Sequence, residues 1–298
     1  MAEHSAVYVG EGRLLVTTAW GFHLYCPSRE MSIVPQLVAS GKFERELADF
    51  LISSILPGDV VVDIGANIGV FTTMLGHLVG DKGRVFAFEP VSANFDFLRD
   101  NVESNWLGPR VSLHQCAIGD SNELEYIKSH PCWGGLASVG SVGTSQMTTG
   151  VSGRGSYIEQ TQVFRLDDIL EGDGELALVK IDVEGHELRV FRGMSQLLAD
   201  RRIRAVVFEC IASRMGDDWR PFVSLLAELA KDGWTFSILR GERQGESVSV
   251  EDVAAHGHLY HVLMRRPGEA EHSALQPSLD PLVVGPDDPL LLKIEGAD

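Results

Sequence analysis

The chain has 298 residues, and its 25 Lys and Arg against 42 Asp and Glu give a formal net charge of −17 at pH 7. This length accommodates one large α/β domain or two modest ones, and a hydrophobic share of 44% is ordinary for a soluble globular protein. The acidic balance argues against nucleic acids and anionic membrane surfaces as main partners, because both select clustered Lys and Arg.

The cysteines and the N-terminal residues indicate in which cellular compartment the protein is expected. Cys26, Cys116, Cys132 and Cys210 lie far apart without a CxxC pair, so neither a disulfide framework nor a zinc site is indicated. The first residues lack the pattern of a signal peptide, and the most apolar window contains Asp63, Asn67 and three glycines, which a membrane span disfavours. We expect a cytoplasmic protein that has no membrane partner.

Residues 1–57 form an N-terminal cap segment in this interpretation. The stretch "EGRLLVTTAW" (11–20) is compatible with a hairpin, and "VPQLVASGKFERELADFLISSIL" (34–56) has apolar residues at helical spacing up to Pro57-Gly58. We expect this largely helical cap to pack on a main domain that spans residues 58–266.

From Val60 the sequence alternates between apolar strand patterns and helical patterns. The strands are predicted at 60–65, 84–90, 111–119, 176–185, 204–210, 234–239 and 258–265, and the helices at 68–79, 92–104, 186–199 and 220–231. This alternation predicts an α/β fold with a mostly parallel, doubly wound sheet that is covered on both faces. The last two predicted strands follow each other without a predicted helix between them, which favours an antiparallel pair at the sheet edge.

Two segments interrupt the alternation. Residues 129–162 are rich in Gly, Ser and Thr and are too long for a simple connection, so we interpret them as a loop that covers the substrate, with local disorder as the alternative. The tail 267–298 holds five prolines and seven acidic residues against one Lys, which is typical of a poorly ordered extension. Its apolar "LLLKI" (290–294) could dock on a partner subunit, which leaves a homo-oligomer open.

The stretch "VVDIGANIG" (61–69) predicts a strand, a glycine turn and the start of a helix. At the carboxyl edge of a doubly wound sheet, Gly65 and Gly69 allow close approach of a ligand to the backbone and to the helix N-terminus. The spacing differs from the dinucleotide fingerprint, and Asn67 fills the space that a pyrophosphate would need. Asp63 repels phosphate but can accept a hydrogen bond from an ammonium group, which indicates an amino-acid-like end on the ligand.

The second strand ends in "FAFEP", which places Glu89 24 residues after Gly65. An acidic residue at this position commonly binds the hydroxyl pair of a ribose. A nucleoside joined to an amino-acid chain is S-adenosylmethionine, which we therefore predict as the cofactor. The third strand end would flank the adenine through Cys116, Ala117 and Ile118.

The fourth strand ends in "KIDVEGHE" and brings several titratable groups to the same edge. His186 is the preferred general base, because a neutral imidazole accepts a proton near pH 7. Asp182 is predicted to contact the cofactor or to orient His186. Glu184 is predicted to orient the acceptor, or to act as the base itself if burial raises its pKa.

Three further residues are candidates for acceptor contacts. Glu44 begins a helix that could fold across the cofactor, Trp133 could close over an apolar acceptor, and Glu209 ends the fifth strand. Asp182, Glu184 and Glu209 could also form an oxygen site for magnesium, but the pattern lacks clear further ligands and we expect no metal.

Six motifs together are specific for one family. They are "SGKFE" (40–44), "VVDIGANIGVFT" (61–72), "VFAFEPVSANFDFLRDN" (85–101), "CAIGD" (116–120), "FRLDDIL" (164–170) and "LVKIDVEGHELRVFRGM" (178–194). Through them the sequence resembles the FkbM family of S-adenosylmethionine-dependent methyltransferases over roughly residues 35–265. The resemblance implies a class I methyltransferase fold (Rossmann-like) and O-methylation of a natural product, glycoside, sugar or lipid-like acceptor, as in secondary metabolite biosynthesis.

The leading interpretation is thus an S-adenosylmethionine-dependent O-methyltransferase that acts on a hydroxyl group of a small molecule. Two alternatives stay open, namely N-methylation of a small-molecule amine, which needs less of a base, and a non-catalytic cofactor-binding scaffold. A dehydrogenase that uses a nicotinamide dinucleotide is disfavoured by the missing third glycine and by Asn67.

Overall fold

The computed structural model describes residues 4–130, 132, 138–139, 157–172, 174–239 and 246–268. Its centre is an eight-stranded sheet in the order β14-β13-β15-β12-β11-β4-β5-β6. These strands are β4 (Val60–Ile64), β5 (Arg84–Phe88), β6 (Val111–His114), β11 (Leu176–Ile181), β12 (Ile203–Ile211), β13 (Thr235–Ile238), β14 (Glu246–Val248) and β15 (His258–Arg265). The five strands from β6 to β12 run parallel, which confirms the predicted α/β class with a mostly parallel sheet.

The antiparallel part of the sheet differs from the prediction in one respect. β13 and β15 do pair antiparallel, but β15 lies inside the sheet between β12 and β13, and the edge strand is β14, which was not predicted. Val262, Leu263 and Met264 of β15 are all fully buried. An uninterrupted apolar run of this kind is typical of a strand that is covered on both faces.

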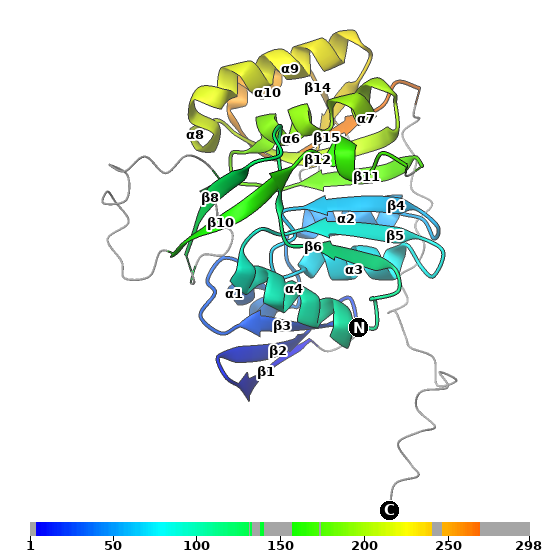
Figure 1. Ribbon diagram of the computed structural model, residues 1–298. Helices are drawn as coiled ribbons and strands as arrows, with labels where there is room; N and C mark the ends of the chain where they lie inside the picture. The colour runs from blue at the N-terminus through cyan, green and yellow to red at the C-terminus, as the bar shows by residue number, and fades with distance from the viewer. Residues whose placement is uncertain are drawn as a thin grey trace, which may run out of the picture.

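Helices cover both faces of the sheet (Figure 1). One layer contains α2 (Arg45–Ser54), α3 (Val70–Leu78) and α4 (Ser92–Ser104), and the other contains α6 (Glu187–Gly193), α7 (Ser195–Ala199), α9 (Trp219–Lys231) and α10 (Val250–His256). Successive strand residues point to opposite faces, so Val61 packs in the core beneath α3 whereas Val62 packs in the core beneath α6. The doubly wound arrangement is thereby confirmed.

The N-terminal segment is half sheet and half helix. The predicted hairpin is formed by β1 (Ser5–Gly10) and β2 (Arg13–Thr17), and β3 (His23–Pro27) adds a third strand that was not predicted. The helical stretch is broken into α1 (Val34–Ser40) and α2 because Gly41 has φ 68° and Glu44 has φ 41°. A Cβ on Gly41 would lie 2.7 Å from the backbone nitrogen of Ala19, so only glycine fits there.

A second sheet lies beside the carboxyl edge of the central one (Figure 1). It contains β7 (Ala117–Ile118), β8 (Leu124–Ser129), β9 (Ser138–Val139) and β10 (Tyr157–Phe164) in the order β7-β10-β8-β9. The interpretation of 129–162 as one long loop was therefore wrong at both ends, since Ser129 and residues 157–162 belong to paired strands. Trp133, most of that segment and the tail beyond Gly268 lie outside the described residues.

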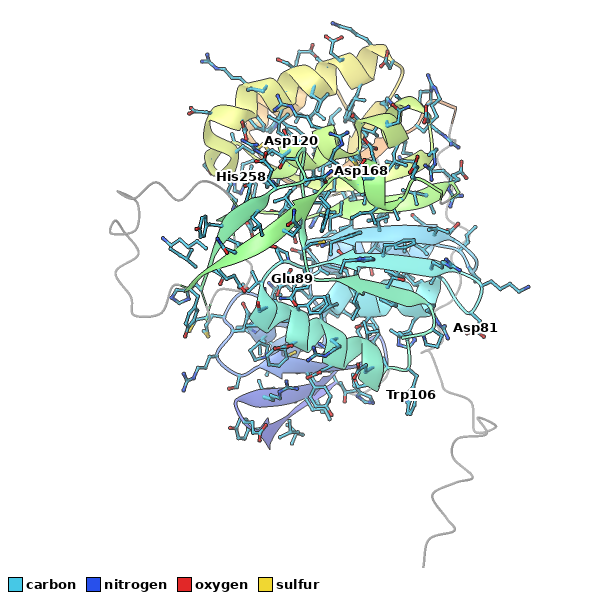
Figure 2. The ribbon with its side chains drawn as sticks, viewed as in Figure 1. Asp81, Glu89, Trp106, Asp120, Asp168 and His258 are labelled. Atoms are coloured by element: carbon cyan, nitrogen blue, oxygen red, sulfur yellow. The ribbon has the colours of Figure 1, made fainter. Side chains whose placement is uncertain are left out.

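Short helices complete the fold and position its loops. They are α5 (Leu166–Ile169), α8 (Ala212–Met215) and the 3-10 helix η3 (Gly216–Asp218). Glu89 follows β5 at the carboxyl edge of the sheet, whereas Asp81 and Trp106 precede β5 and β6 at the opposite edge (Figure 2). In the described part of the chain, no helix combines the length and the apolar character that a membrane span requires.

Candidate active site

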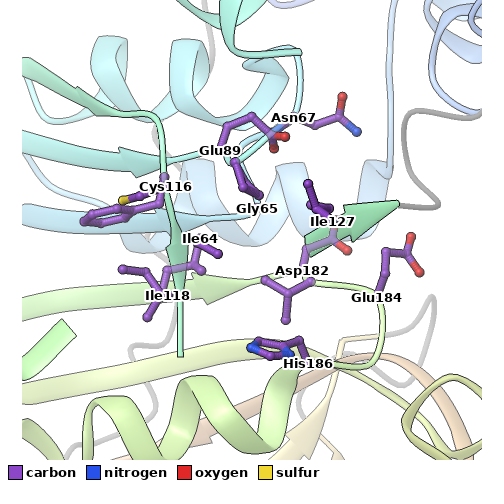
Figure 3. Close-up of a pocket in the computed structure, with 14 residues that line it drawn as sticks. Ile64, Gly65, Asn67, Glu89, Cys116, Ile118, Ile127, Asp182, Glu184 and His186 are labelled. Atoms are coloured by element: carbon purple, nitrogen blue, oxygen red, sulfur yellow. The ribbon is translucent and has the colours of Figure 1, made fainter. Parts of the chain in front are cut away.

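A pocket opens at the carboxyl edge, where strand order reverses between β4 and β11. Its volume is about 560 Å³, including the part that is open to solvent, which suits a small molecule or cofactor. Nine of the residues that the sequence nominated line it, namely Gly65, Asn67, Glu89, Cys116, Ala117, Ile118, Asp182, Glu184 and His186. Figure 3 shows Asn67 and Glu89 on one side of the pocket, His186 on the other and Asp182 between them. Ile127 of β8 also lines the pocket and comes from outside the predicted motifs.

The two glycines of the turn are required by the protein itself. Gly65 has φ 78°, and a Cβ there would lie 1.8 Å from the carbonyl oxygen of Asp182. Gly69 has φ 89°, does not line the pocket, and makes room for the Leu98 side chain, whose Cδ1 would lie 2.7 Å from an added Cβ. The turn is therefore clamped between β11 and α4, which holds the pocket wall in a fixed shape.

Glu89 is held in position by backbone N–H groups. Its oxygens accept hydrogen bonds from the Asn67 nitrogen at 2.8 Å and the Val91 nitrogen at 2.9 Å. Burial nevertheless raises the pKa of Glu89 to about 7. The carboxylate thus lacks the solvation of an exposed acid, and hydroxyl donors from a ligand would stabilise its ionised form.

Asp63 lies behind the pocket and does not line it. Its two oxygens accept from Lys180 Nζ at 3.0 Å and from Thr72 Oγ1 at 2.6 Å, and the side chain is fully buried. Burial alone lowers the pKa of Lys180, but the attraction of Asp63 and Asp182 outweighs it and raises that pKa above its ordinary value. The geometry gives no direct contact between Asp63 and a ligand; instead the pair fixes Lys180, which also donates to the Gly65 carbonyl at 3.3 Å.

Asn101 supports the same turn from α4 and was not singled out by sequence reasoning. Its amide nitrogen donates to the Ile68 carbonyl at 2.7 Å and to the Tyr25 carbonyl at 3.0 Å, and its oxygen accepts from the Tyr25 nitrogen at 2.6 Å. The side chain is fully buried. One residue therefore ties β3, α4 and the start of α3 together, and its position at the end of "VFAFEPVSANFDFLRDN" (85–101) was the available signal.

His186 begins α6 and lines the pocket, but it is 6% exposed. Burial and then the nearby Arg189 lower its pKa to about 4. Its Nε2 has no hydrogen-bond partner among the described residues. The imidazole is neutral at pH 7, as predicted, yet such a low proton affinity gives a general base little driving force.

The residues predicted to contact the adenine form a buried, largely apolar wall. Cys116 is 5% exposed, Ala117 is 5% exposed and Ile118 is 1% exposed, and all three face the pocket. Burial raises the pKa of the Cys116 thiol to about 11, so it stays protonated at neutral pH. This wall can pack against a flat aromatic ring.

Asp182 and Glu184 form the acidic wall of the pocket. Asp182 lies 3.8 Å from Lys180 Nζ, and its pKa is raised by burial and by Glu44, with Lys180 opposing. Glu184 has φ 58° and forms an ion pair with Arg214 of α8. No hydrogen bond is recorded between Asp182 and His186 within the described residues, so the predicted orienting role lacks a direct contact.

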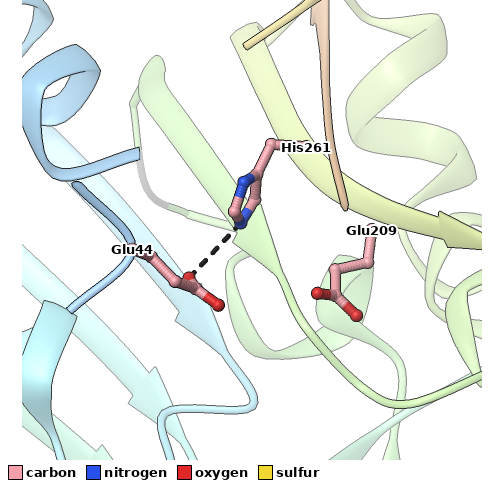
Figure 4. Close-up of side chains that lie close together, drawn as sticks. All are labelled: Glu44, Glu209 and His261. Carbon is pink, nitrogen blue, oxygen red and sulfur yellow. Dashed lines mark ion pairs between the residues drawn. The ribbon is translucent and has the colours of Figure 1, made fainter. Parts of the chain in front are cut away.

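A second polar cluster lies next to this wall and consists of Glu44, Glu209 and His261 (Figure 4). Glu44 precedes α2, Glu209 lies in β12 and His261 lies in β15, and one ligand atom from each lies within 4.8 Å of the others. Sequence reasoning nominated the two glutamates but missed His261. The only signal for it was a histidine inside an otherwise apolar strand.

Asp182 and Glu184 form a comparable group with Glu209, again within 4.8 Å. Both groups have donor atoms that suit a divalent cation. Arg214 already neutralises part of this charge, since it lies 3.1 Å from Glu209 and pairs with Glu184. Nothing in the described geometry therefore requires a metal.

Comparison with known proteins decides the family. A family model described as the methyltransferase FkbM domain matches residues 63–242, which is more than half of the chain. The chain belongs to the FkbM methyltransferase family. The matched region begins at Asp63, near the end of β4, and contains β5, β11 and β12, so it includes the loops that form the pocket.

Two curated FkbM-type relatives are similar in sequence. The chain is 35% identical over 176 residues to the 31-O-demethyl-FK506 methyltransferase FkbM of Streptomyces tacrolimicus, a match that covers 51% of this chain and 65% of the relative. It is 29% identical over 188 residues to the hexuronic acid methyltransferase AglP of Haloferax volcanii, covering 62% of this chain and 68% of the relative. The chain thus spans slightly less than two thirds of the first relative.

Solved methyltransferase structures resemble the FkbM-family fold more distantly. The O-methyltransferase TomG of Streptomyces achromogenes, in complex with SAM, has a TM-score of 0.45 at 12% identity, over 81% of this chain and 88% of that chain. An O-methyltransferase of Bacillus cereus, in complex with SAH, has a TM-score of 0.42 at 15% identity, over 75% of this chain and 81% of that chain.

Proposed function

We propose that this FkbM-family protein is an S-adenosylmethionine-dependent O-methyltransferase that acts on a hydroxyl group of a small molecule. The observation that carries the proposal is the pocket that joins an apolar wall, the buried Glu89 carboxylate and the acidic wall of Asp182 and Glu184 at one sheet edge. This order of surfaces suits a nucleoside that is linked to a cationic chain.

The residues fit the cofactor part by part. Cys116 and Ile118 offer an apolar surface for an adenine ring, and the Glu89 carboxylate can accept both hydroxyl groups of a ribose. The acidic wall favours a positively charged sulfonium over a phosphate. When bound, S-adenosylmethionine supplies an electrophilic methyl group; the protein binds and orients both reactants and keeps water away from them.

The relatives support a hydroxyl acceptor. The name of the Streptomyces relative specifies a 31-O-demethyl compound, and that of the Haloferax relative specifies a hexuronic acid. Both are small molecules with oxygen functions. A natural product, glycoside or sugar is accordingly the proposed acceptor class for this chain.

Calorimetry with adenosylhomocysteine and turnover of labelled S-adenosylmethionine test the proposal together. We expect binding that a tenfold excess of NAD does not displace, and label transfer to at least one compound in a panel of hydroxylated polyketides, glycosides and sugars. Absence of binding would refute cofactor use. Binding without any transfer across hydroxyl and amine panels would favour a non-catalytic scaffold, and transfer to amines alone would favour N-methylation.

A further inference from the structure

The cluster of Glu44, Glu209 and His261 adjoins the cofactor pocket without being part of it. The three residues come from the loop before α2, from β12 and from β15, and none of them lines the pocket. Glu209 connects the two regions, because its carboxylate also lies within 4.8 Å of ligand atoms of Asp182 and Glu184, which do line it. A group that binds in the cluster would therefore lie beside whatever occupies the acidic end of the pocket.

The polar tips of the cluster converge and keep unused hydrogen-bonding capacity. His261 Nε2 lies 3.3 Å from Glu44 Oε2, and Figure 4 shows the Glu209 carboxylate beside this pair. Glu44 Oε2 is buried and has no hydrogen-bond partner among the described residues. The side chains are only partly closed to solvent, with 23% of Glu44 and 12% of His261 exposed. Apart from its ion-pair contact with His261, this buried Glu44 oxygen can therefore accept a hydrogen bond from a ligand.

The charge around the cluster favours a neutral hydroxyl over an anionic group. Burial and then Asp182, Glu44 and Glu187 raise the pKa of Glu209 to about 9, although Arg214 lies 3.1 Å from it. Further negative charge would be costly here, whereas a hydroxyl donor or a developing positive charge would be stabilised.

We propose that Glu44, Glu209 and His261 bind the acceptor hydroxyl, and that His261 Nε2 takes its proton while Glu44 stabilises the resulting imidazolium. This inference rests on the proposed O-methyl transfer. In the reaction the acceptor O–C bond forms as the C–S bond of the sulfonium breaks, the C–S electron pair stays on sulfur, and the hydroxyl proton moves to the imidazole. One positive charge thereby passes from sulfur to His261, and no other reactant is needed.

His261 suits this task better than His186. His186 is almost fully buried on the far side of the pocket, and its pKa is lowered to about 4. His261 lies beside two carboxyl groups, and its Nε2 is 3.3 Å from Glu44 Oε2. Glu44 has a left-handed backbone conformation at the break before α2, and in this scheme it binds the hydroxyl and stabilises the imidazolium.

The test compares His261→Gln and Glu44→Gln with the wild type and with His256→Gln, which changes an exposed histidine of α10. For His261→Gln we expect adenosylhomocysteine affinity within threefold of the wild type and a kcat that is about 10²- to 10⁴-fold lower, the usual range for a general base. For Glu44→Gln we expect a smaller loss of kcat, and for His256→Gln no change. Thermal unfolding verifies that each variant folds.

A binding readout complements the kinetics. When the acceptor identified in the panel is added to protein loaded with adenosylhomocysteine, the imidazole NMR signals of His261 should shift and those of His256 should not. Unmoved His261 signals despite acceptor binding would overturn the inference. The inference would also be overturned if His261→Gln kept more than a tenth of wild-type kcat, or if His186→Gln lost kcat instead. Activity that chelators abolish and that Mg²⁺ or Mn²⁺ restores would overturn it as well.

The outcomes separate the two proposals. If the wild type turns over a hydroxyl acceptor and His261→Gln does so equally well, only the assignment of the base fails. If the wild type binds no adenosylhomocysteine or methylates no hydroxyl compound, the proposed function fails and the assignment fails with it.

Discussion

Replacing Gly65 by alanine tests whether the turn after β4 is shaped by its contact with β11. An added Cβ would lie 1.8 Å from the Asp182 carbonyl oxygen and 2.8 Å from its carbonyl carbon. The two loops would have to separate by about 1.6 Å, the difference between 1.8 Å and an ordinary contact of 3.4 Å. Because both residues line the pocket, the pocket wall would move with them.

The magnitude follows from three contributions. A positive φ costs alanine about 1–2 kcal/mol relative to glycine. Overpacking adds about 1–3 kcal/mol. Separation also strains the hydrogen bond from the Asp182 nitrogen to the Ile64 carbonyl, now 3.0 Å, and that from Lys180 Nζ to the Gly65 carbonyl, now 3.3 Å. Each contributes about 1 kcal/mol, so the expected loss of unfolding free energy is about 4–7 kcal/mol.

Gly58→Ala is the matched control, because Gly58 has φ +98° and no heavy atom within 4 Å of an added Cβ. It should lose only the backbone contribution of about 1–2 kcal/mol. Urea unfolding measures both losses, and calorimetry with adenosylhomocysteine should show binding at least about tenfold weaker in Gly65→Ala alone. Equal stability of the two variants together with unchanged binding by Gly65→Ala would refute the reasoning.

Three further predictions concern buried polar groups. The pKa of Glu89 is raised from 4.5 to about 7, so the folded protein loses stability as pH rises through that window. Between pH 5 and pH 8, the unfolding free energy measured with urea should fall by up to about 3 kcal/mol more in the wild type than in Glu89→Gln. Equal falls would contradict this. Lys180→Met leaves the Asp63 carboxylate buried without its partner and should lower the unfolding free energy by about 3–5 kcal/mol in the same assay. The double variant that also carries Asp63→Asn should regain most of this loss, and no recovery would contradict the pairing. Asn101→Ala removes three hydrogen bonds of a buried side chain, including that to the Ile68 carbonyl. It should lower the unfolding free energy by about 2–4 kcal/mol and weaken adenosylhomocysteine binding, and no change in either would contradict the role of Asn101 in holding the turn.

Elements with a strong local pattern were predictable from the sequence. The predicted helix 92–104 and the predicted strand 258–265 coincide with α4 and β15, because amphipathic periodicity and a bounded apolar run are local properties. Elements whose partners are distant were not predictable. β8 and β10 alternate exposed and less exposed residues, but they are separated by a Gly- and Ser-rich stretch that concealed their pairing.

The site was predictable where parallel strands form it. The ends of β4, β5 and β11 share one edge by topology, so Gly65, Glu89 and Asp182 were expected to meet. His261 was missed because β15 is antiparallel and internal: His258 pairs with Ile211, so the beginning of β15, rather than its end, lies at the carboxyl edge. A strand assumed to lie at the sheet edge gave no reason to bring His261 next to Glu209.

The most direct test of the central claim is a crystal structure of the protein with adenosylhomocysteine. The account predicts adenine against Cys116 and Ile118, ribose hydroxyl groups hydrogen-bonded to the Glu89 carboxylate, and the sulfur toward Asp182. A molecule bound away from the turn after β4, or bound there with its ribose out of reach of Glu89, would contradict it.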